Sequence, residues 1–103
     1  MKMSKEDMSR AIIKQKILPL YSSELANKNI EAVKACHAAG LMLFEFTNRT
    51  PNALEAFREL KKYCEENLPG CILGVGTVKK AIEAEQFAKA GAAFLVSPIV
   101  SVE

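Results

Sequence analysis

Apolar residues along the chain alternate between the spacing of helices and the spacing of buried strands. In the first part, an amphipathic helix is predicted over residues 4–15 and a short strand over residues 17–21, interrupted by Pro19. Ser22 to Glu24 then provide hydroxyl caps and an early negative charge, and the next helical periodicity ends at Gly40. The pattern therefore predicts helix, strand, helix.

The same order continues beyond Gly40, each helix being followed by an apolar strand. The almost unbroken apolar run of the next strand is typical of a parallel strand buried on both faces. The predicted elements are a strand over 41–47, a helix that begins near Pro51 and stops at Pro69-Gly70, a strand over 71–78, a helix over 79–90, and a strand over 92–98. Four strands and three crossover helices therefore follow the opening helix.

This alternation predicts an α/β fold with a parallel sheet, because each strand-plus-helix unit occupies roughly 20–30 residues. Ala38-Ala39-Gly40 before one apolar run matches Lys89-Ala90-Gly91 before another, 51 residues later. The unit suits either an open doubly wound sheet or half of an eightfold β/α barrel, whose complete form needs about 200 residues or more. With 103 residues, length alone favours the open sheet.

Composition and net charge exclude several classes of function. Half of the residues are hydrophobic and 25% are charged, which is the balance of a soluble globular protein. A formal charge of +2 is too small for nucleic-acid binding, and no apolar run is long enough to span a membrane. The polar opening does not suit a secretory signal, so a cytoplasmic protein is expected.

The three cysteines, Cys36, Cys64 and Cys71, form no C-x-x-C pair, so they are expected to be reduced. A zinc site that recruits His37 would need closer ligand pairs, and no metal site is predicted. His37 suits a partner for the helix dipole or a surface position better than a catalytic role.

Chemistry is expected at the carboxyl ends of the parallel strands, where loops and helix N-termini converge. The polar or small residues at these ends are Glu45, Thr47, Asn48, Arg49, Gly74, Gly76, Thr77, Ser97 and Pro98. Gly74 to Thr77 lack both the third glycine of a dinucleotide fingerprint and the glycine-lysine pair of a phosphate loop. Their two glycines instead let a ligand approach the backbone closely, or form only a tight turn.

Glu45 is the most informative of these residues, because a carboxylate within an apolar strand is costly to bury unless it is paired or protonated. An ion pair with Arg49, or a side chain that extends its carboxylate toward solvent, is the structural interpretation. The functional interpretation is a carboxyl group whose pKa is raised by desolvation, which suits proton transfer near neutral pH.

The ordered set 44–51, 74–78 and 90–98 resembles the 2-keto-3-deoxy-6-phosphogluconate (KDPG) aldolase family, which includes 4-hydroxy-2-oxoglutarate (KHG) aldolases. The resemblance runs from about residue 17 to residue 98. It implies a (β/α)8 barrel, of which residues 1–103 are one partial domain. Residues 1–15 are then the N-terminal helix, and residues 16–103 the first four βα units without the fourth helix.

The resemblance also implies the reaction and the residues that carry it. The reaction is reversible cleavage of a 2-keto-3-deoxy-6-phospho sugar acid to pyruvate and glyceraldehyde 3-phosphate, or of 4-hydroxy-2-oxoglutarate to pyruvate and glyoxylate. It proceeds through a lysine Schiff base, with no metal or cofactor. Glu45 corresponds to the proton-shuttling carboxylate, Arg49 and Thr77 to groups that hold the substrate carboxylate, and Gly74, Gly76 and Pro98 to the substrate site.

The Schiff-base lysine of the family lies in a Lys-Phe-Phe-Pro-like motif that does not occur here, and Lys79 and Lys80 do not match it. The chain alone is therefore predicted to be inactive. Val75 and Ile99 replace the commoner alanine and glycine, which affects substrate detail. The family implies a trimer and a keto-acid substrate. The alternatives are a self-associating, non-catalytic half-barrel and a small anion-binding α/β domain.

Overall fold

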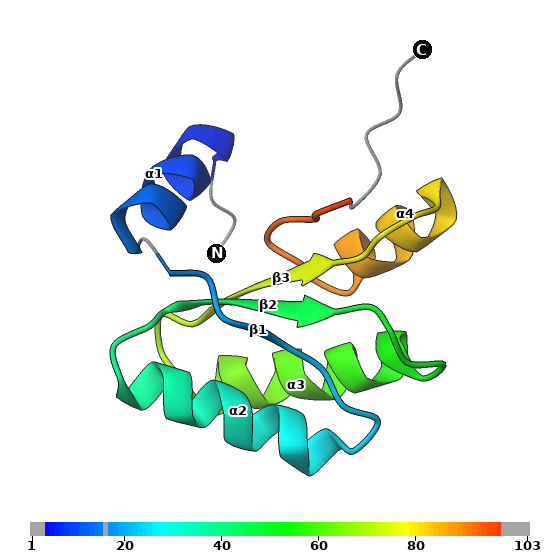
Figure 1. Cartoon of the computed structure of the whole chain (residues 1–103), viewed down its shortest axis with the longest axis horizontal. Helices are drawn as coiled ribbons and strands as arrows, with labels where there is room; N and C mark the ends of the chain where they lie inside the picture. Colours follow the sequence, from blue (N-terminus) through cyan, green and yellow to red (C-terminus); the bar gives the residue numbers. More distant parts are fainter. Residues whose placement is uncertain (1–3, 16, 98–103) are drawn as a thin grey trace.

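The computed structural model describes residues 4–15 and 17–97. A parallel three-stranded sheet in the order β1-β2-β3 is connected by helices (Figure 1). The elements in chain order are α1 (Lys5–Gln15), β1 (Leu20–Tyr21), α2 (Ala26–Ala38), β2 (Leu43–Thr47), α3 (Ala53–Asn67), β3 (Ile72–Gly76) and α4 (Ala81–Lys89). The predicted α/β class and the order of helices and strands are confirmed as far as β3 and α4.

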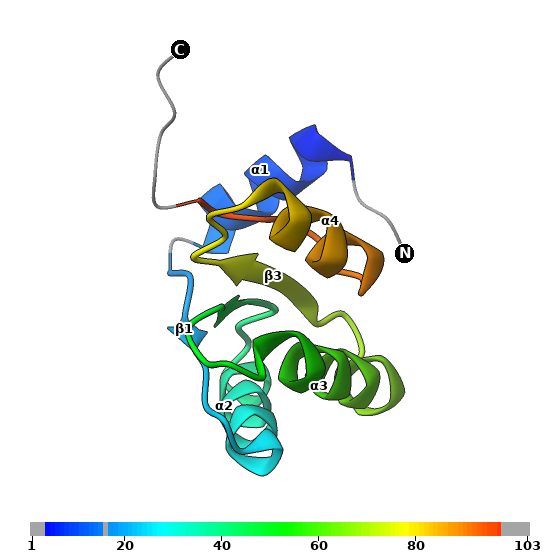
Figure 2. The ribbon, with the colours of Figure 1, turned by 90° about the vertical axis from the view of Figure 1, so that its right-hand side faces the viewer.

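The hydrophobic core lies between the sheet and the helices α2, α3 and α4. Figure 2 shows α2 and α3 below the strands and α4 above β3. Because side chains alternate between the two faces of a strand, β2 directs Phe44 and Phe46 toward these helices. The Phe57 ring of α3 lies 5.7 Å from Phe46 and 5.8 Å from Phe87 of α4, measured between ring centroids. One aromatic column therefore joins the sheet to two helices.

Helix α1 lies on the other side of the sheet from α2 and α3 (Figure 1). Gln15 at its end attaches it to the start of β2. The side-chain Oε1 of Gln15 accepts the N–H groups of Met42 and Leu43 at 3.1 and 3.0 Å, and its Nε2 donates to the Leu43 carbonyl at 3.1 Å. A side chain thus completes the hydrogen bonding of the strand at its amino end.

The helix boundaries confirm one part of the prediction and correct another. Gly40 and Gly91, with φ of +87° and +100°, end α2 and α4 in the left-handed conformation that glycine allows. The predicted hydroxyl cap of α2 is wrong, because its N-cap is Leu25 without a side-chain hydrogen bond. The Ser23 hydroxyl instead accepts the N–H of Leu25 at 3.2 Å, one step before the helix.

The first strand is shorter than the predicted residues 17–21. Because Pro19 has no N–H to donate, the ladder with β2 begins after it and contains only Leu20 and Tyr21. The Pro19 carbonyl still accepts the N–H of Glu45 at 2.8 Å.

The predicted fourth strand over residues 92–98 is not formed as a strand; within the described residues 92–97 it is a single parallel bridge between Leu95 and Val75. Backbone hydrogen bonds fix this segment to β3, including Val75 N–H to the Phe94 carbonyl at 2.9 Å and Val96 N–H to the Val75 carbonyl at 2.8 Å. Leu95 and Val96 remain exposed, because no strand in the described part of the chain pairs with their other side.

Candidate active site at the carboxyl ends of the strands

Glu45 lies in the middle of β2, on the face opposite the aromatic core. The parallel register pairs it with Leu20 of β1 and Gly74 of β3, and pairs Thr47 with Gly76. Paired positions in a sheet direct their side chains to the same face. Glu45, Thr47, Gly74 and Gly76 therefore share one face.

The Glu45 carboxylate occupies the space beside Gly76. A Cβ atom at position 76 would lie 2.0 Å from Glu45 Oε2 and 2.5 Å from Cδ, far inside contact distance. Gly76 is thus required by the close approach of a neighbouring side chain. The sequence placed both residues at the same end of the sheet, and the structure brings them into contact.

Burial raises the pKa of the Glu45 carboxyl above its ordinary value, and the positive charge of Arg49 counteracts this only in part. The ion pairs of the described residues are Arg58–Glu55 and Lys89–Glu85, so the predicted alternative of a direct ion pair between Glu45 and Arg49 is not found there. Arg49 is exposed in the loop after β2. A carboxyl group with a raised pKa beside a free guanidinium can transfer protons and bind an anion at one place.

Gly74 has a different neighbour. A Cβ atom there would lie 2.2 to 2.4 Å from three carbons of the Phe94 ring. The ring therefore rests on the backbone of β3. The substrate-binding role assigned to Gly74 stays a prediction.

Thr77 follows β3 directly and has a φ of +63°, the one left-handed non-glycine residue in the described part of the chain. A β-branched residue in this region costs on the order of 1–3 kcal/mol. Such strain persists where neighbouring contacts impose it, and it concentrates at functional sites.

Asn48 and Glu83 are the contacts that hold this loop, and sequence reasoning did not assign either of them this role. Asn48 Nδ2 donates to the Thr77 carbonyl and to Glu83 Oε2, both at 3.3 Å. Glu83 Oε1 accepts the N–H groups of Lys79 and Lys80 at 3.1 and 3.2 Å. These hydrogen bonds lower the pKa of Glu83. An acidic residue in the first turn of the last helix was the one signal in the sequence.

Thr47 provides a further polar group on the same face as Glu45. Its side chain is 2% exposed, and its hydroxyl has no hydrogen-bond partner among the described residues. An unpaired buried hydroxyl costs about 1–3 kcal/mol. The hydroxyl is therefore buried and unpaired beside Gly76, on the same face as Glu45.

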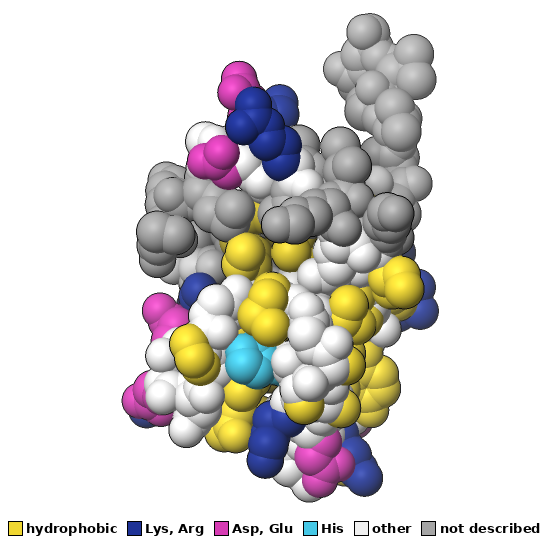
Figure 3. All heavy atoms as spheres, turned by 90° about the vertical axis from the view of Figure 1, so that its left-hand side faces the viewer, with side chains coloured by type: hydrophobic (Ala, Val, Ile, Leu, Met, Phe, Trp, Pro, Cys, Tyr) yellow, Lys and Arg dark blue, Asp and Glu magenta, His cyan; other side chains and the backbone are white. Residues whose placement is uncertain are grey.

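Ser97, Pro98 and His37 are the candidates that remain. Ser97 is exposed at the end of the described segment, and Pro98 lies outside the described residues. His37 lies at the opposite end of the sheet, where hydrophobic side chains gather beside the single histidine (Figure 3), and its Nε2 is 2.9 Å from the Pro69 carbonyl. The hydrogen bond agrees with a structural role for His37.

The comparison with protein families decides the identity of the fold. The model of the family described as "Aldolase: KDPG and KHG aldolase" matches residues 8–103. The chain belongs to the KDPG and KHG aldolase family. Among curated aldolases, the 2-dehydro-3-deoxy-phosphogluconate aldolase of Zymomonas mobilis is 43% identical over 65 residues, which are 63% of this chain and 29% of the relative. The enzyme of the same name from Treponema pallidum is 32% identical over 88 residues, 85% of this chain and 40% of the relative.

Solved aldolase structures agree. The 2-keto-3-deoxy-6-phosphogluconate aldolase of Zymomonas mobilis ZM4 with 3-phosphoglycerate superposes with a TM-score of 0.80 at 32% identity, covering 95% of this chain and 44% of that one. The Legionella pneumophila KDPG aldolase, with pyruvate captured as a covalent carbinolamine, gives a TM-score of 0.72 at 27% identity over 84% of this chain and 40% of its own. The chain thus spans 29% to 44% of the length of these relatives. Within its described residues, no helix has the length and apolar character to cross a membrane.

Proposed function

We propose that this chain forms the proton-transfer and carboxylate-binding part of a class I aldolase that releases pyruvate from a 2-keto-3-deoxy-6-phospho sugar acid, from 4-hydroxy-2-oxoglutarate, or from both. The observation that carries the proposal is the Glu45 carboxyl, which lies against Gly76 with a raised pKa at the carboxyl ends of the strands. Membership of the aldolase family supports it. The sheet then corresponds to part of the first half of a β/α barrel.

Glu45 acts as the proton shuttle in this proposal. It transfers protons to and from the carbinolamine and accepts the proton of the aldol hydroxyl as the carbon–carbon bond breaks. A raised pKa suits both directions of transfer, because it brings the carboxyl closer to the pH at which both protonation states are populated.

Arg49 and Thr77 hold the substrate carboxylate. The guanidinium offers a planar pair of donors to a carboxylate. Thr77 adds a hydroxyl where α4 is about to begin, and the hydrogen bond from Asn48 to its carbonyl fixes the loop at the same place. Gly74, Gly76 and Pro98 complete the proposed substrate site.

The Schiff-base amine is not part of this proposal for residues 1–103. Lys79 and Lys80 are exposed beside the start of α4 and are the lysines nearest in sequence to Thr77, yet neither matches the family motif. Without that amine the chain forms no pyruvate imine, and it is inactive alone. A trimer in the cytoplasm is the setting that the family resemblance implies.

Borohydride trapping tests whether the chain alone can form a Schiff base with pyruvate. Incubation of the 103-residue chain with pyruvate and borohydride is expected to give no covalent adduct, and a stable pyruvyl adduct would overturn the inactivity. The chain is then mixed with the lysine-bearing remainder of the Zymomonas mobilis aldolase, and pyruvate release is measured.

In that mixture Glu45→Gln is expected to lower the rate by about 100-fold or more. Glu55→Gln is the matched control, because Glu55 is an exposed residue of α3 paired with Arg58. Equal rates for the natural mixture and the Glu45→Gln mixture would remove the role assigned to Glu45.

A second candidate, self-association of the chain, is favoured by apolar side chains at both edges of the sheet. Leu20 and Tyr21 in β1 are 57% and 40% exposed, and Leu95 and Val96 beside β3 are 38% and 40% exposed. Unpaired edges of this kind favour strand pairing between copies. Sedimentation at micromolar concentration distinguishes the candidates, since a folded monomer excludes self-association.

A further inference from the structure

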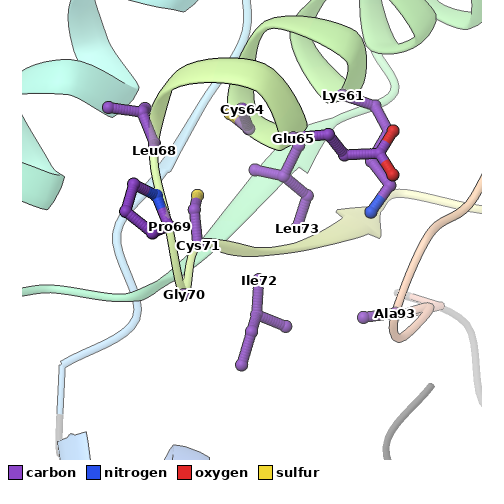
Figure 4. A pocket seen from close by; sticks show the side chains of 10 residues that line it. All are labelled: Lys61, Cys64, Glu65, Leu68, Pro69, Gly70, Cys71, Ile72, Leu73 and Ala93. Atoms are coloured by element: carbon purple, nitrogen blue, oxygen red, sulfur yellow. The ribbon is translucent and has the colours of Figure 1, made fainter. Parts of the chain in front are cut away.

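Two cysteines, Cys64 and Cys71, lie together at the amino-terminal end of β3, away from the candidate active site. Cys64 is in the last turns of α3, and Cys71 directly precedes β3. Both line a cavity of about 290 Å³ whose other lining residues include Lys61 and Glu65 of α3 and Ala93 (Figure 4). Neither cysteine has been given a function by the aldolase chemistry.

The turn between α3 and β3 brings the two thiols together. The Leu68 N–H donates to the Cys64 carbonyl at 2.9 Å, and the Cys71 N–H donates to the Leu68 carbonyl at 3.1 Å. Gly70, with a φ of +81°, completes the reversal. As a result the side chains of Cys64 and Cys71 share a hydrogen bond although six residues separate them.

The charges around the pair favour a thiolate at Cys71. The hydrogen bond from Cys64 lowers the pKa of Cys71 and raises that of Cys64, and the Lys61 ammonium favours the ionised thiol. Glu65 acts against ionisation at Cys64. Burial, and to a smaller extent Cys71, raises the pKa of Cys36 on α2. The aliphatic part of Lys61 passes over Gly91, where a Cβ atom would lie 2.8 Å from its Cε, so its position is limited from that side.

The exposure of the two cysteine residues differs in a way that suits two roles. Cys71 is partly exposed and Cys64 is 3% exposed, while both line the same cavity. The described residues place no group of three or more metal-ligating side chains together.

We propose that Cys71 and Cys64 form an oxidation site for hydrogen peroxide and small hydroperoxides, in which Cys71 is the attacking thiolate and Cys64 the resolving thiol. The proposal does not rest on the aldolase activity. It assigns the cavity as the entry path of a small peroxide to the sulfur of Cys71.

The chemistry balances without another reagent. The Cys71 sulfur attacks one peroxide oxygen, the O–O bond breaks, and the leaving oxygen takes up a proton as water or alcohol, which leaves a sulfenic acid. The Cys64 sulfur then attacks the Cys71 sulfur, a disulfide forms, and the hydroxyl leaves as water with the Cys64 proton. Two thiols are oxidised, and one peroxide is reduced.

Peroxide treatment of the folded 103-residue chain, followed by intact mass and peptide mapping, tests the site. The expected product is about 2 Da lighter through loss of two hydrogen atoms, links Cys64 to Cys71, and leaves Cys36 open to alkylation. A link that includes Cys36, oxidation of Cys71 to a sulfinic acid without a disulfide, or a disulfide that forms only in urea would each overturn the proposal. This map needs no variant.

Variants then separate the two roles. Cys64→Ser is expected to leave a sulfenic acid at Cys71 that dimedone traps, and Cys71→Ser is expected to slow peroxide consumption by about 10-fold or more. Cys36→Ser is the matched control and should react like the natural chain. If Cys71→Ser consumes peroxide as fast as Cys36→Ser, Cys71 is not the attacking thiol.

Discussion

The Glu45 carboxylate fills the space beside Gly76 that a side chain at position 76 would need, so an alanine there forces the carboxylate to move. The added Cβ would lie 2.0 Å from Oε2, 2.5 Å from Cδ and 3.2 Å from Cγ of Glu45. These atoms form the end of a flexible side chain, which can rotate away while the backbone stays in place. We therefore expect Gly76→Ala to cost only about 1 kcal/mol of unfolding free energy, at the low end for overpacking.

Gly74→Ala is the matched control on the same strand. Its Cβ would lie 2.2 to 2.4 Å from three atoms of the Phe94 ring, and a rigid ring on the sheet cannot move aside as easily as a carboxylate. We expect a larger cost, about 2–3 kcal/mol. The two alanines therefore separate stability from the site: Gly74→Ala destabilises the fold more, and Gly76→Ala displaces the carboxylate.

Urea unfolding measures the first effect, and NMR titration of the Glu45 carboxyl carbon measures the second. The expected result is that the pKa of Glu45 falls toward its ordinary value in Gly76→Ala, because the displaced carboxylate loses part of its burial. In Gly74→Ala it stays raised. An unchanged pKa in Gly76→Ala, together with a cost larger than that of Gly74→Ala, would refute the reasoning.

Three further substitutions test the contacts around the site. Asn48→Ala removes two hydrogen bonds and should cost about 1–2 kcal/mol of unfolding free energy, measured in urea. Its control, Asn52→Ala, loses one exposed hydrogen bond to the Glu24 carbonyl and should cost less. Equal costs would contradict the role of Asn48. Phe57→Ala removes a fully buried ring that contacts two others and should cost about 3–5 kcal/mol; a cost under about 1 kcal/mol by the same assay would show that the aromatic column is not a unit. Glu45→Gln tests how the raised pKa of Glu45 affects stability. Folding favours the protonated carboxyl, so the stability that this group contributes is complete below the ordinary pKa of 4.5 and is lost as pH rises through the folded pKa. The variant should gain stability relative to the natural chain as pH rises from 4.5 through the folded pKa, and a constant difference from acid to neutral pH would exclude the linkage.

The order of elements could be predicted from sequence because each helix and strand has its own periodicity. The left-handed stops at Gly40 and Gly91 followed from glycine alone. The fourth strand could not be predicted correctly, because residues 92–97 have the apolar composition of a strand but pair with β3 alone among the described residues. Strand length depends on both neighbours, and periodicity describes only the strand itself.

The candidate site could also be predicted only in part from the sequence. Glu45 stood out because one charge interrupts an apolar run, and its raised pKa agrees with that expectation. The bonds of Asn48 to Thr77 and Glu83 join residues 29 and 35 positions apart, and no local pattern encodes such contacts. The positive φ of Thr77 was equally hidden, because a β-branched residue ordinarily disfavours that conformation.

The hydrogen bonds of Asn48 have a dynamic consequence, since they join the loop after β2 to the loop after β3. Neither loop can open fully without breaking the contact with the other. Amide hydrogen exchange in residues 48–50 and 77–80 should therefore report one shared opening equilibrium, and Asn48→Ala should make that opening more frequent. The two sides of the candidate site thus behave as one cooperative unit, held by the Asn48 side chain and by its backbone N–H, which donates to the Gly76 carbonyl at 2.9 Å.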